Sequence, residues 1–260
     1  MAKIQAITSR DNPLLAQVRR LIRQPDAYRK HAGVWLEGEH LCRAYADRQG
    51  GEGVRAIVSD SGWDSPPLRT LASRADSVSI VPPALMDDLS TLDSAAPIGF
   101  VVAWPGPGAL RSDAPSIVLD RVQDAGNVGT ILRSAAAFGA TQAIALDGTA
   151  ALWSPKVLRA AMGAHFALDL VERVALEALD ALAVPMLATS SHAGDPLHAA
   201  ALPWPCAWIV GHEGQGVADA LMRRCATTVR IPQPGGGESL NVAIAASICL
   251  YESARRRLAG

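Results

Sequence analysis

The feature that most constrains the fold is a regular alternation of short apolar segments with helical segments in the second half of the chain. Strands are predicted at residues 116–119, 142–146, 166–170, 185–189, 206–210 and 228–231. Helices are predicted at 128–138, 155–162, 176–182 and 217–223, with a long final helix from about 240 to 258. Apolar strands that alternate with helices indicate a parallel sheet with helices on both faces.

The first half carries a smaller version of the same alternation. A helix over residues 12–24 is predicted by the helical spacing of Leu14, Leu15, Val18, Leu21 and Ile22. Strands are predicted at 34–36, 55–58, 78–81 and 98–102, and helices at 39–48, 67–74 and 83–92. The segment PGPGALRSDAP, 105–115, is dense in breakers and marks a boundary. We therefore expect an α/β fold with a small N-terminal α/β sandwich domain, 1–108, and a parallel-sheet domain, 109–260.

Composition limits the possible partners. Apolar residues make up 49% of the 260 residues, enough for a substantial core, and the formal net charge of −1 gives no general attraction to polyanions. A nucleic acid would therefore have to bind a local patch. The first thirty residues offer one, with Lys3, Arg10, Arg19, Arg20, Arg23, Arg29 and Lys30 against only Asp11 and Asp26. The alternative is that these side chains simply solvate a helix face.

Cysteine spacing and the N-terminus indicate the compartment. Cys42, Cys206, Cys225 and Cys249 are scattered, with no CxxC pair and no histidine cluster of ligand spacing. The N-terminal residues lack an apolar signal core, and no stretch approaches the ~20 apolar residues of a membrane span. We expect a soluble cytoplasmic protein with reduced cysteines, no metal and no membrane attachment.

Three glycine-bearing loops follow predicted strands, where ligands of open α/β sheets bind. The first is LDRVQDAGNVGTILRSAAAFGA. Its Asn127 and Arg133 are less than two helical turns apart and are candidates to flank one pocket. The alternative is that Asn127 caps the helix and Arg133 is merely solvated.

The second and third loops lie in the C-terminal third of the chain. WIVGHEGQGV places three glycines around Glu213, and a simple turn would explain the glycines but give Glu213 no role. In VRIPQPGGGESLNVAIAASICLYE, a glycine-rich and mobile loop is expected before the last helix. Ser239 is a candidate N-cap of that helix, and Asn241 is a candidate to point into the cleft.

Together these loops resemble the signature motifs of the SpoU family of RNA ribose methyltransferases, within the SPOUT class. The resemblance rests on NVGTILRSAAAFGA, IVGHEGQGV and IPQPGGGESLNVAIAASI, in that order. The segment ITSRDNPLLAQVRRLIRQPDAYRKHAGVWLEGEHLCRAYA is similar to the N-terminal RNA-binding domain of many such enzymes, which resembles a ribosomal-protein fold. The resemblance implies a deep C-terminal trefoil knot, which patterns alone would not suggest, and a homodimer formed by the C-terminal domain.

The resemblance also implies a cofactor and a set of roles. S-adenosyl-L-methionine would lie in the knot, near Thr189, Gly211, Ile231, Ser239 and Leu240. A second group, Asn127, Arg133, Glu213 and Asn241, would act on the substrate side, and Arg10, Arg19, Arg20 and Arg23 would bind RNA.

The role of Arg133 can be narrowed by its chemistry. A guanidinium with a pKa above about 12 is a poor proton acceptor near neutral pH. We therefore expect Arg133 to orient the ribose and its phosphate and to stabilise charge. The general base stays open, since Glu213 is a candidate but would equally serve to hold Asn127 or its own loop.

Two other functions fit part of the pattern. Gly126, Gly129 and Asp147 imitate a dinucleotide-binding oxidoreductase, although DAGNVG lacks the first glycine of that motif. A non-catalytic RNA-binding or ribosome-assembly protein would explain the fold but not the polar residues of the motifs. Ribosomal RNA fits the two-domain layout better than tRNA, but which of the two is the substrate stays open. The target nucleotide and a role in ribosome maturation or in antibiotic resistance also stay open.

Overall fold

The structure is a computed structural model that describes residues 2–236 and 239–259. It contains two compact units. The first comprises Met1–Gly106 and Trp153–Phe166, and the second comprises Pro107–Leu152 and Ala167–Gly260. The boundary expected at 108/109 assumed two continuous stretches, whereas the chain leaves the second unit at residue 153 and places α8 (Pro155–Ala161) in the first.

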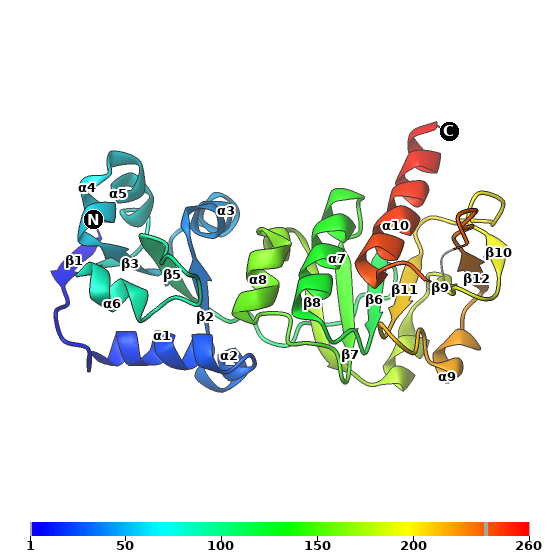
Figure 1. The fold of residues 1–260 in the computed structure, drawn as a ribbon, viewed down its shortest axis with the longest axis horizontal. Coiled ribbons are helices and arrows are strands. Elements are labelled where there is room, and N and C mark those ends of the chain that lie inside the picture. The colour runs from blue at the N-terminus through cyan, green and yellow to red at the C-terminus, as the bar shows by residue number, and fades with distance from the viewer. Residues whose placement is uncertain (1, 237–238, 260) are drawn as a thin grey trace. The chain divides into compact units, whose positions relative to one another are not determined.

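The first unit is an α/β sandwich, as expected. Its mixed sheet has the order β1-β4-β3-β5-β2, in which β5 runs antiparallel to β2 and β3. The strands are β1 (Lys3–Ala6), β2 (Gly33–Glu37), β3 (Arg55–Ser59), β4 (Ser77–Val81) and β5 (Ile98–Ala103). Figure 1 shows α1 (Pro13–Arg23), α2 (Ala27–His31) and α6 (Pro83–Asp87) on one side of this sheet, and α3 (Glu39–Gln49), α4 (Asp60–Asp64) and α5 (Pro66–Ala72) on the other.

Helix α1 forms where its sequence pattern predicts. The Asn12 side chain accepts a hydrogen bond from the Leu14 N–H at 2.9 Å, and Pro13 occupies the first turn, where its missing N–H costs nothing. Leu15, Val18 and Leu21 are buried, so the opposite, arginine-bearing face is left to solvent.

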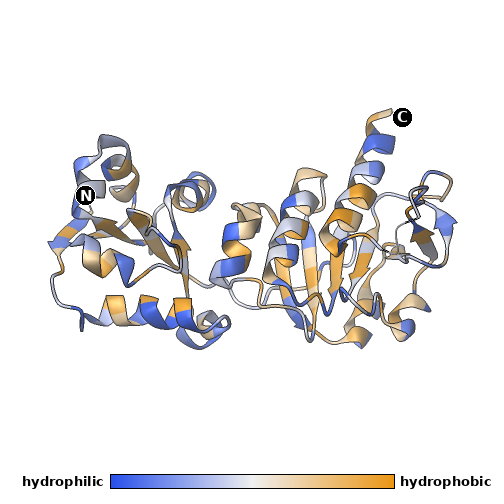
Figure 2. Cartoon of the chain, in the orientation of Figure 1, coloured by the Kyte–Doolittle hydropathy of each residue, from blue (hydrophilic) through white to orange (hydrophobic). Residues whose placement is uncertain are grey.

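The second unit is built on a wholly parallel sheet, as predicted. Its order is β10-β12-β9-β11-β6-β7-β8, and each strand pair is parallel. The strands are β6 (Ser116–Asp120), β7 (Gln142–Leu146), β8 (Asp169–Val174), β9 (Met186–Thr189), β10 (Asp195–Pro196), β11 (Ala207–Gly211) and β12 (Thr227–Arg230). Every residue of β6, β7 and β11 is buried, which is why these strands are largely apolar; Figure 2 shows them mostly in the hydrophobic colour.

Two helices that belong to different sequence motifs pack against each other in this unit. Helix α7 (Ala125–Ala137) lies beside α10 (Val242–Ala259), as Figure 1 shows. A 2.7 Å hydrogen bond between Ser134 and Ser247 joins the two helices. A separate hydrophobic cluster joins sheet residues Val118 and Ile209 to the short helix α9 (Asp219–Met222) through Leu221. The α7–α10 pair therefore holds the first and third motif loops at one end of the sheet.

The structure corrects several expected elements. The strand predicted at 166–170 exists but was placed too early: Ala164–Ala167 form a 3₁₀ turn, and β8 begins only at Asp169. Phe166 is apolar because its ring packs on Tyr45 in the first unit, not because it lies in a sheet. The segment expected as helix 176–182 is a 3₁₀ helix, Leu176–Ala181. Strand β1 was missed because all four of its residues are exposed and carry no hydrophobic alternation.

Candidate functional site

A cavity of about 860 Å³ lies at the carboxyl ends of β9, β11 and β12. This volume is within the range of about 300–1,000 Å³ that is usual for small-molecule sites. Its lining includes all five residues expected around a cofactor, namely Thr189, Gly211, Ile231, Ser239 and Leu240. The structure thus brings together positions from the loops after β9, β11 and β12, which are far apart in sequence. Gly237 and Glu238, in the loop after β12, lie outside the described residues.

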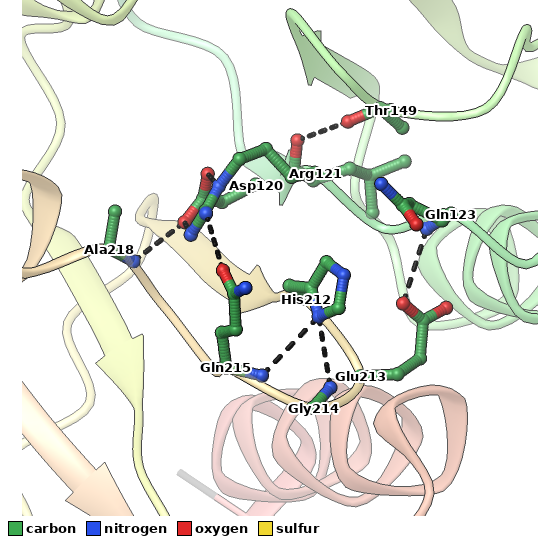
Figure 3. A network of polar contacts seen from close by, with 10 residues as sticks. Asp120, Arg121, Gln123, Thr149, His212, Glu213, Gly214, Gln215 and Ala218 are labelled. Carbon is green, nitrogen blue, oxygen red and sulfur yellow. Dashed lines mark hydrogen bonds and ion pairs between the residues drawn. The ribbon is translucent and has the colours of Figure 1, made fainter.

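The loop after β11 is closed on itself by backbone contacts. His212 and Gly216 exchange two backbone hydrogen bonds, of 3.1 and 2.8 Å. The His212 ring accepts hydrogen bonds at Nδ1 from the N–H groups of Gly214 and Gln215, at 3.0 and 3.3 Å (Figure 3). A Cβ atom on Gly211 would lie 2.0 Å from the carbonyl carbon of Gly216, so only glycine fits where β11 enters the loop.

Glu213 ties this loop to the loop between β6 and α7. Its carboxylate accepts hydrogen bonds from the N–H groups of Gln123 and Asp124, at 3.2 and 3.0 Å, and from Asn127 Nδ2 at 3.1 Å (Figure 3 shows the first of these). Asn127 Oδ1 in turn accepts a hydrogen bond from Asn241 Nδ2 at 2.9 Å. Asn127, Glu213 and Asn241 therefore form one polar chain that joins all three motif loops.

Neither Asn127 nor Ser239 caps a helix, and the caps observed instead explain how this group of hydrogen-bonded side chains can form. Helix α7 is capped by Asp124, which accepts from the Asn127 N–H at 2.8 Å, so Asn127 is a helical residue whose side chain is free to bind Glu213. Helix α10 begins at Val242, and Asn241, not Ser239, accepts from the N–H groups at its start, at 2.9 and 3.3 Å. Asn241 is the cap because it immediately precedes the first helical residue.

The protonation of Glu213 follows from these contacts. Burial raises the pKa of this carboxyl, but the hydrogen bonds from Asn127 and from the backbone N–H groups of Asp124 and Gln123 outweigh burial, so the pKa lies below its ordinary value. Glu213 is therefore ionised at neutral pH and a weak base. Its contacts favour the role of holding Asn127 and the loop.

Arg133 takes no part in the hydrogen bonds that join Asn127, Glu213 and Asn241. It lies on α7 with an exposed side chain, does not line the cavity, and makes no hydrogen bond or ion pair with any residue that the structure describes. Other arginines of this unit, such as Arg121 and Arg224, are bound to carboxylates. The charge of Arg133 is thus available to a ligand.

The four arginines expected to bind RNA fall into two pairs. Arg10 forms an ion pair with Asp88, with Nε 2.7 Å from Oδ2, and Arg19 donates to the carbonyl oxygen of Arg10. Arg20 and Arg23 are exposed on α1, and within residues 2–236 and 239–259 neither side chain has a hydrogen-bond or ion-pair partner. Only the second pair is free to meet a polyanion.

Sequence reasoning missed the buried carboxylate at the end of β6. Asp120 is 2% exposed and accepts hydrogen bonds from Arg121 and from the N–H of Ala218 (Figure 3). An acidic residue that ends an apolar strand was the available signal. Among the described residues, no group of three or more His, Cys, Asp or Glu is placed to hold a metal ion, and no described helix has the length and apolarity to cross a membrane.

Comparison with known proteins places this geometry in a family. The model of the SpoU rRNA Methylase family matches residues 114–251. An uncharacterized tRNA/rRNA methyltransferase of Synechocystis sp. is 33% identical over 98% of this chain and 96% of its own. The 23S rRNA (uridine(2479)-2′-O)-methyltransferase of Streptomyces viridochromogenes is 31% identical over 80% of this chain and 78% of its own. The crystal structure of an AdoMet-bound rRNA methyltransferase from Sinorhizobium meliloti superimposes with a TM-score of 0.84 at 25% identity, covering 98% of each chain.

Proposed function

We propose that this chain, which belongs to the SpoU rRNA methylase family and is an S-adenosylmethionine-dependent RNA ribose 2′-O-methyltransferase, acts on the RNA of the large ribosomal subunit. The Streptomyces relative, which matches both units of the chain, is named for 23S rRNA, and the Sinorhizobium relative is named for rRNA. The observation that carries the proposal is that the second and third motif loops line one cavity, while the hydrogen-bonded chain of Asn127, Glu213 and Asn241 ties the first motif loop to both of them.

The cavity fits S-adenosylmethionine in size and in chemistry. Gly211 lets the backbone of Gly216 and Val217 approach where any Cβ would collide, and this close approach shapes the loop that lines the cavity. We assign Thr189, Gly211, Ile231, Ser239 and Leu240 to holding the cofactor. When bound, it supplies an electrophilic methyl group on a sulfonium.

The remaining polar residues act on the RNA side of the transfer. Arg133 would bind the phosphate beside the target ribose and stabilise the negative charge that develops on the attacking 2′-oxygen. The ionised Glu213 holds Asn127, and Asn127 is held by Asn241, so the amide groups present a fixed polar edge. We assign no residue as the general base, since Arg133 keeps its proton and Glu213 is a weak base.

The proposed substrate is tested by mapping 2′-O-methylation across total RNA from a strain that lacks the gene. We expect one methylated ribose to disappear from 23S rRNA and to return when the gene is restored. Loss of a methyl group only from a tRNA would contradict the ribosomal assignment while leaving the chemistry intact. An unchanged methylation map would favour the non-catalytic RNA-binding alternative.

The dinucleotide-dependent oxidoreductase is not supported by the geometry. Gly126 and Gly129 do not line the cavity, and Asp147 is exposed and 3.9 Å from Arg173, not at a ligand site. The cavity instead lies at strands β9, β11 and β12. A nicotinamide nucleotide is therefore not expected to bind.

We assign RNA binding in the first unit to Arg20 and Arg23 on α1. The variant carrying Arg20→Ala and Arg23→Ala should bind rRNA more weakly, and the slope of log affinity against log salt should fall by about one for each charge removed. Filter binding over a salt series measures both quantities. Arg43→Ala serves as control, because Arg43 is paired with Glu39 within α3. A slope unchanged from that of the native protein would remove α1 from the RNA interface.

We further assign a homodimer to the exposed apolar stripe of α10. Ile244, Tyr251 and Leu258 are 53%, 53% and 89% exposed and lie seven residues apart, hence on one face of the helix. The variant carrying Ile244→Asp and Tyr251→Asp should halve the mass measured by light scattering. Ile4→Asp, which replaces a residue 54% exposed in the first unit, should leave the mass unchanged. A native protein that is already monomeric would contradict the assignment.

Two further family features are proposed for this chain. The segment after β12 leads past the β11 loop to α10, and both line the same cavity, which supports a C-terminal trefoil knot at this site. We place the protein in the cytoplasm, where ribosomal RNA is found.

A further inference from the structure

Arg121 is a residue of the second unit to which the proposed function gives no role. It directly follows β6 and has a φ of +57°, in the left-handed region that favours glycine. A non-glycine residue persists in this conformation only where its surroundings hold it there. The contacts of its side chain are therefore the place to look for its role.

The Arg121 guanidinium joins the strand end to the β11 loop. Its Nε and Nη2 donate to the two carboxylate oxygens of Asp120, at 2.9 and 3.2 Å, and its Nη1 donates to Gln215 Oε1 at 3.0 Å (Figure 3). Asp120 Oδ2 also accepts from the N–H of Ala218 at 2.7 Å. One buried carboxylate and one arginine therefore fix both the middle and the end of the loop.

We infer that Arg121 is a positioning residue for the cofactor, which acts by holding the loop from Gly211 to Ala218 in its binding shape. Gln215, Gly216 and Val217 line the cavity, so a shift of this loop changes the cavity wall. Glu213 anchors the opposite side of the loop to α7. The segment around Gln215 is held by Arg121 instead. A loop held in advance of binding does not have to be ordered by the ligand.

Direct contact between Arg121 and RNA is the alternative. All three guanidinium nitrogens already donate to Asp120 or Gln215, although the side chain is 33% exposed. An RNA phosphate would have to displace one of these acceptors. The two roles differ in which ligand loses affinity when Arg121 is removed.

This inference rests on the proposed function, and its first test uses S-adenosylhomocysteine binding to the intact protein by calorimetry. Arg121→Ala should raise the dissociation constant roughly tenfold, since one charge-assisted contact to the loop is lost while the Glu213 anchor remains. In methyl-transfer assays the KM for S-adenosylmethionine should rise, while kcat and the KM for RNA stay within about threefold of native values. Arg121→Lys should recover little, because an ammonium cannot bridge the carboxylate and the amide with fixed geometry.

Gln215→Ala supplies an independent measure of the same contact. If both residues act through one hydrogen bond, the double variant should bind S-adenosylhomocysteine about as weakly as either single variant, and not about a hundredfold more weakly than the native protein. Arg121→Gly keeps the left-handed backbone without strain and replaces the alanine variant if that one fails to fold. Arg173→Ala is the matched control, because Arg173 has a φ of +55° and faces Asp147 at 3.9 Å, away from the cavity lining.

The outcomes separate the inference from the function on which it rests. A native protein that does not bind S-adenosylhomocysteine overturns the cofactor site itself. Native binding combined with unchanged binding in both Arg121→Ala and Arg121→Gly overturns only the role of Arg121. A rise in the KM for RNA alone would assign Arg121 to the substrate, and an equal loss in Arg173→Ala would show a general effect of left-handed arginines on stability.

Discussion

Replacing Arg133 by alanine should lower methyl-transfer turnover by about 10²- to 10³-fold, which corresponds to roughly 3–4 kcal/mol of lost transition-state stabilisation. The exposed Arg133 guanidinium is not bound to any described side chain, so its five donors are free for a phosphate or a developing oxyanion. Single-turnover assays with saturating RNA measure the effect directly. Arg133→Lys should recover part of the rate, because it keeps the charge but loses the planar, bidentate geometry.

Two measurements separate this role from others. S-adenosylhomocysteine should bind Arg133→Ala as it binds the native protein, because Arg133 does not line the cavity. The melting temperature should also be unchanged, since an exposed and unpaired side chain contributes little to stability. Arg173→Ala, at another exposed arginine of the same unit, should turn over normally. Turnover of Arg133→Ala within threefold of native would remove Arg133 from the mechanism.

Most strands of the second unit were predictable because the central ones, β6, β7 and β11, are buried on both faces and so are largely apolar. The correct elements, such as β7 at Gln142–Leu146, are those whose hydrophobicity has this single cause. The prediction failed at Phe166, which belongs to the first unit and whose hydrophobicity serves a contact with Tyr45 there. It also failed at β1, which is held by pairing with β4 and has no buried residue. Neither cause leaves a periodic signal in the local sequence.

At the site, residue identity was easier to predict than residue partnership. The family motifs pointed to Thr189, Gly211, Ile231, Ser239 and Leu240, which line one cavity. No spacing rule could pair Asn127 with Asn241, because their contact depends on how α7 and α10 pack. Ser239 was the wrong cap candidate for α10, and the alternative of Asn127 as the cap of α7 also failed. The caps are Asp124 and Asn241, which stand at the exact helix starts, and hydrophobic periodicity locates those starts only within a few residues.

Gly211→Ala should weaken S-adenosylhomocysteine binding by more than about 100-fold, because the added methyl group would lie 2.0 Å from the carbonyl carbon of Gly216 and 2.1 Å from the N of Val217. Both are backbone atoms, and moving them breaks the paired His212–Gly216 hydrogen bonds and the bond from the Ala218 N–H to Asp120. Overpacking of this kind should also cost about 1–3 kcal/mol of stability, which thermal denaturation measures.

Gly214→Ala is the matched control for the steric cause of this loss. It lies in the same loop, but a Cβ there meets nothing closer than the His212 ring at 3.8 Å, so the melting temperature should stay at the native value. The comparison therefore holds residue type, loop and added volume constant and changes only the distance to the opposing backbone. Binding by Gly211→Ala within tenfold of native would mean that the β11 loop can open without losing its ligand. In that case the close approach of Gly211 to Gly216 would be a consequence of chain packing and would have no part in shaping the cofactor site.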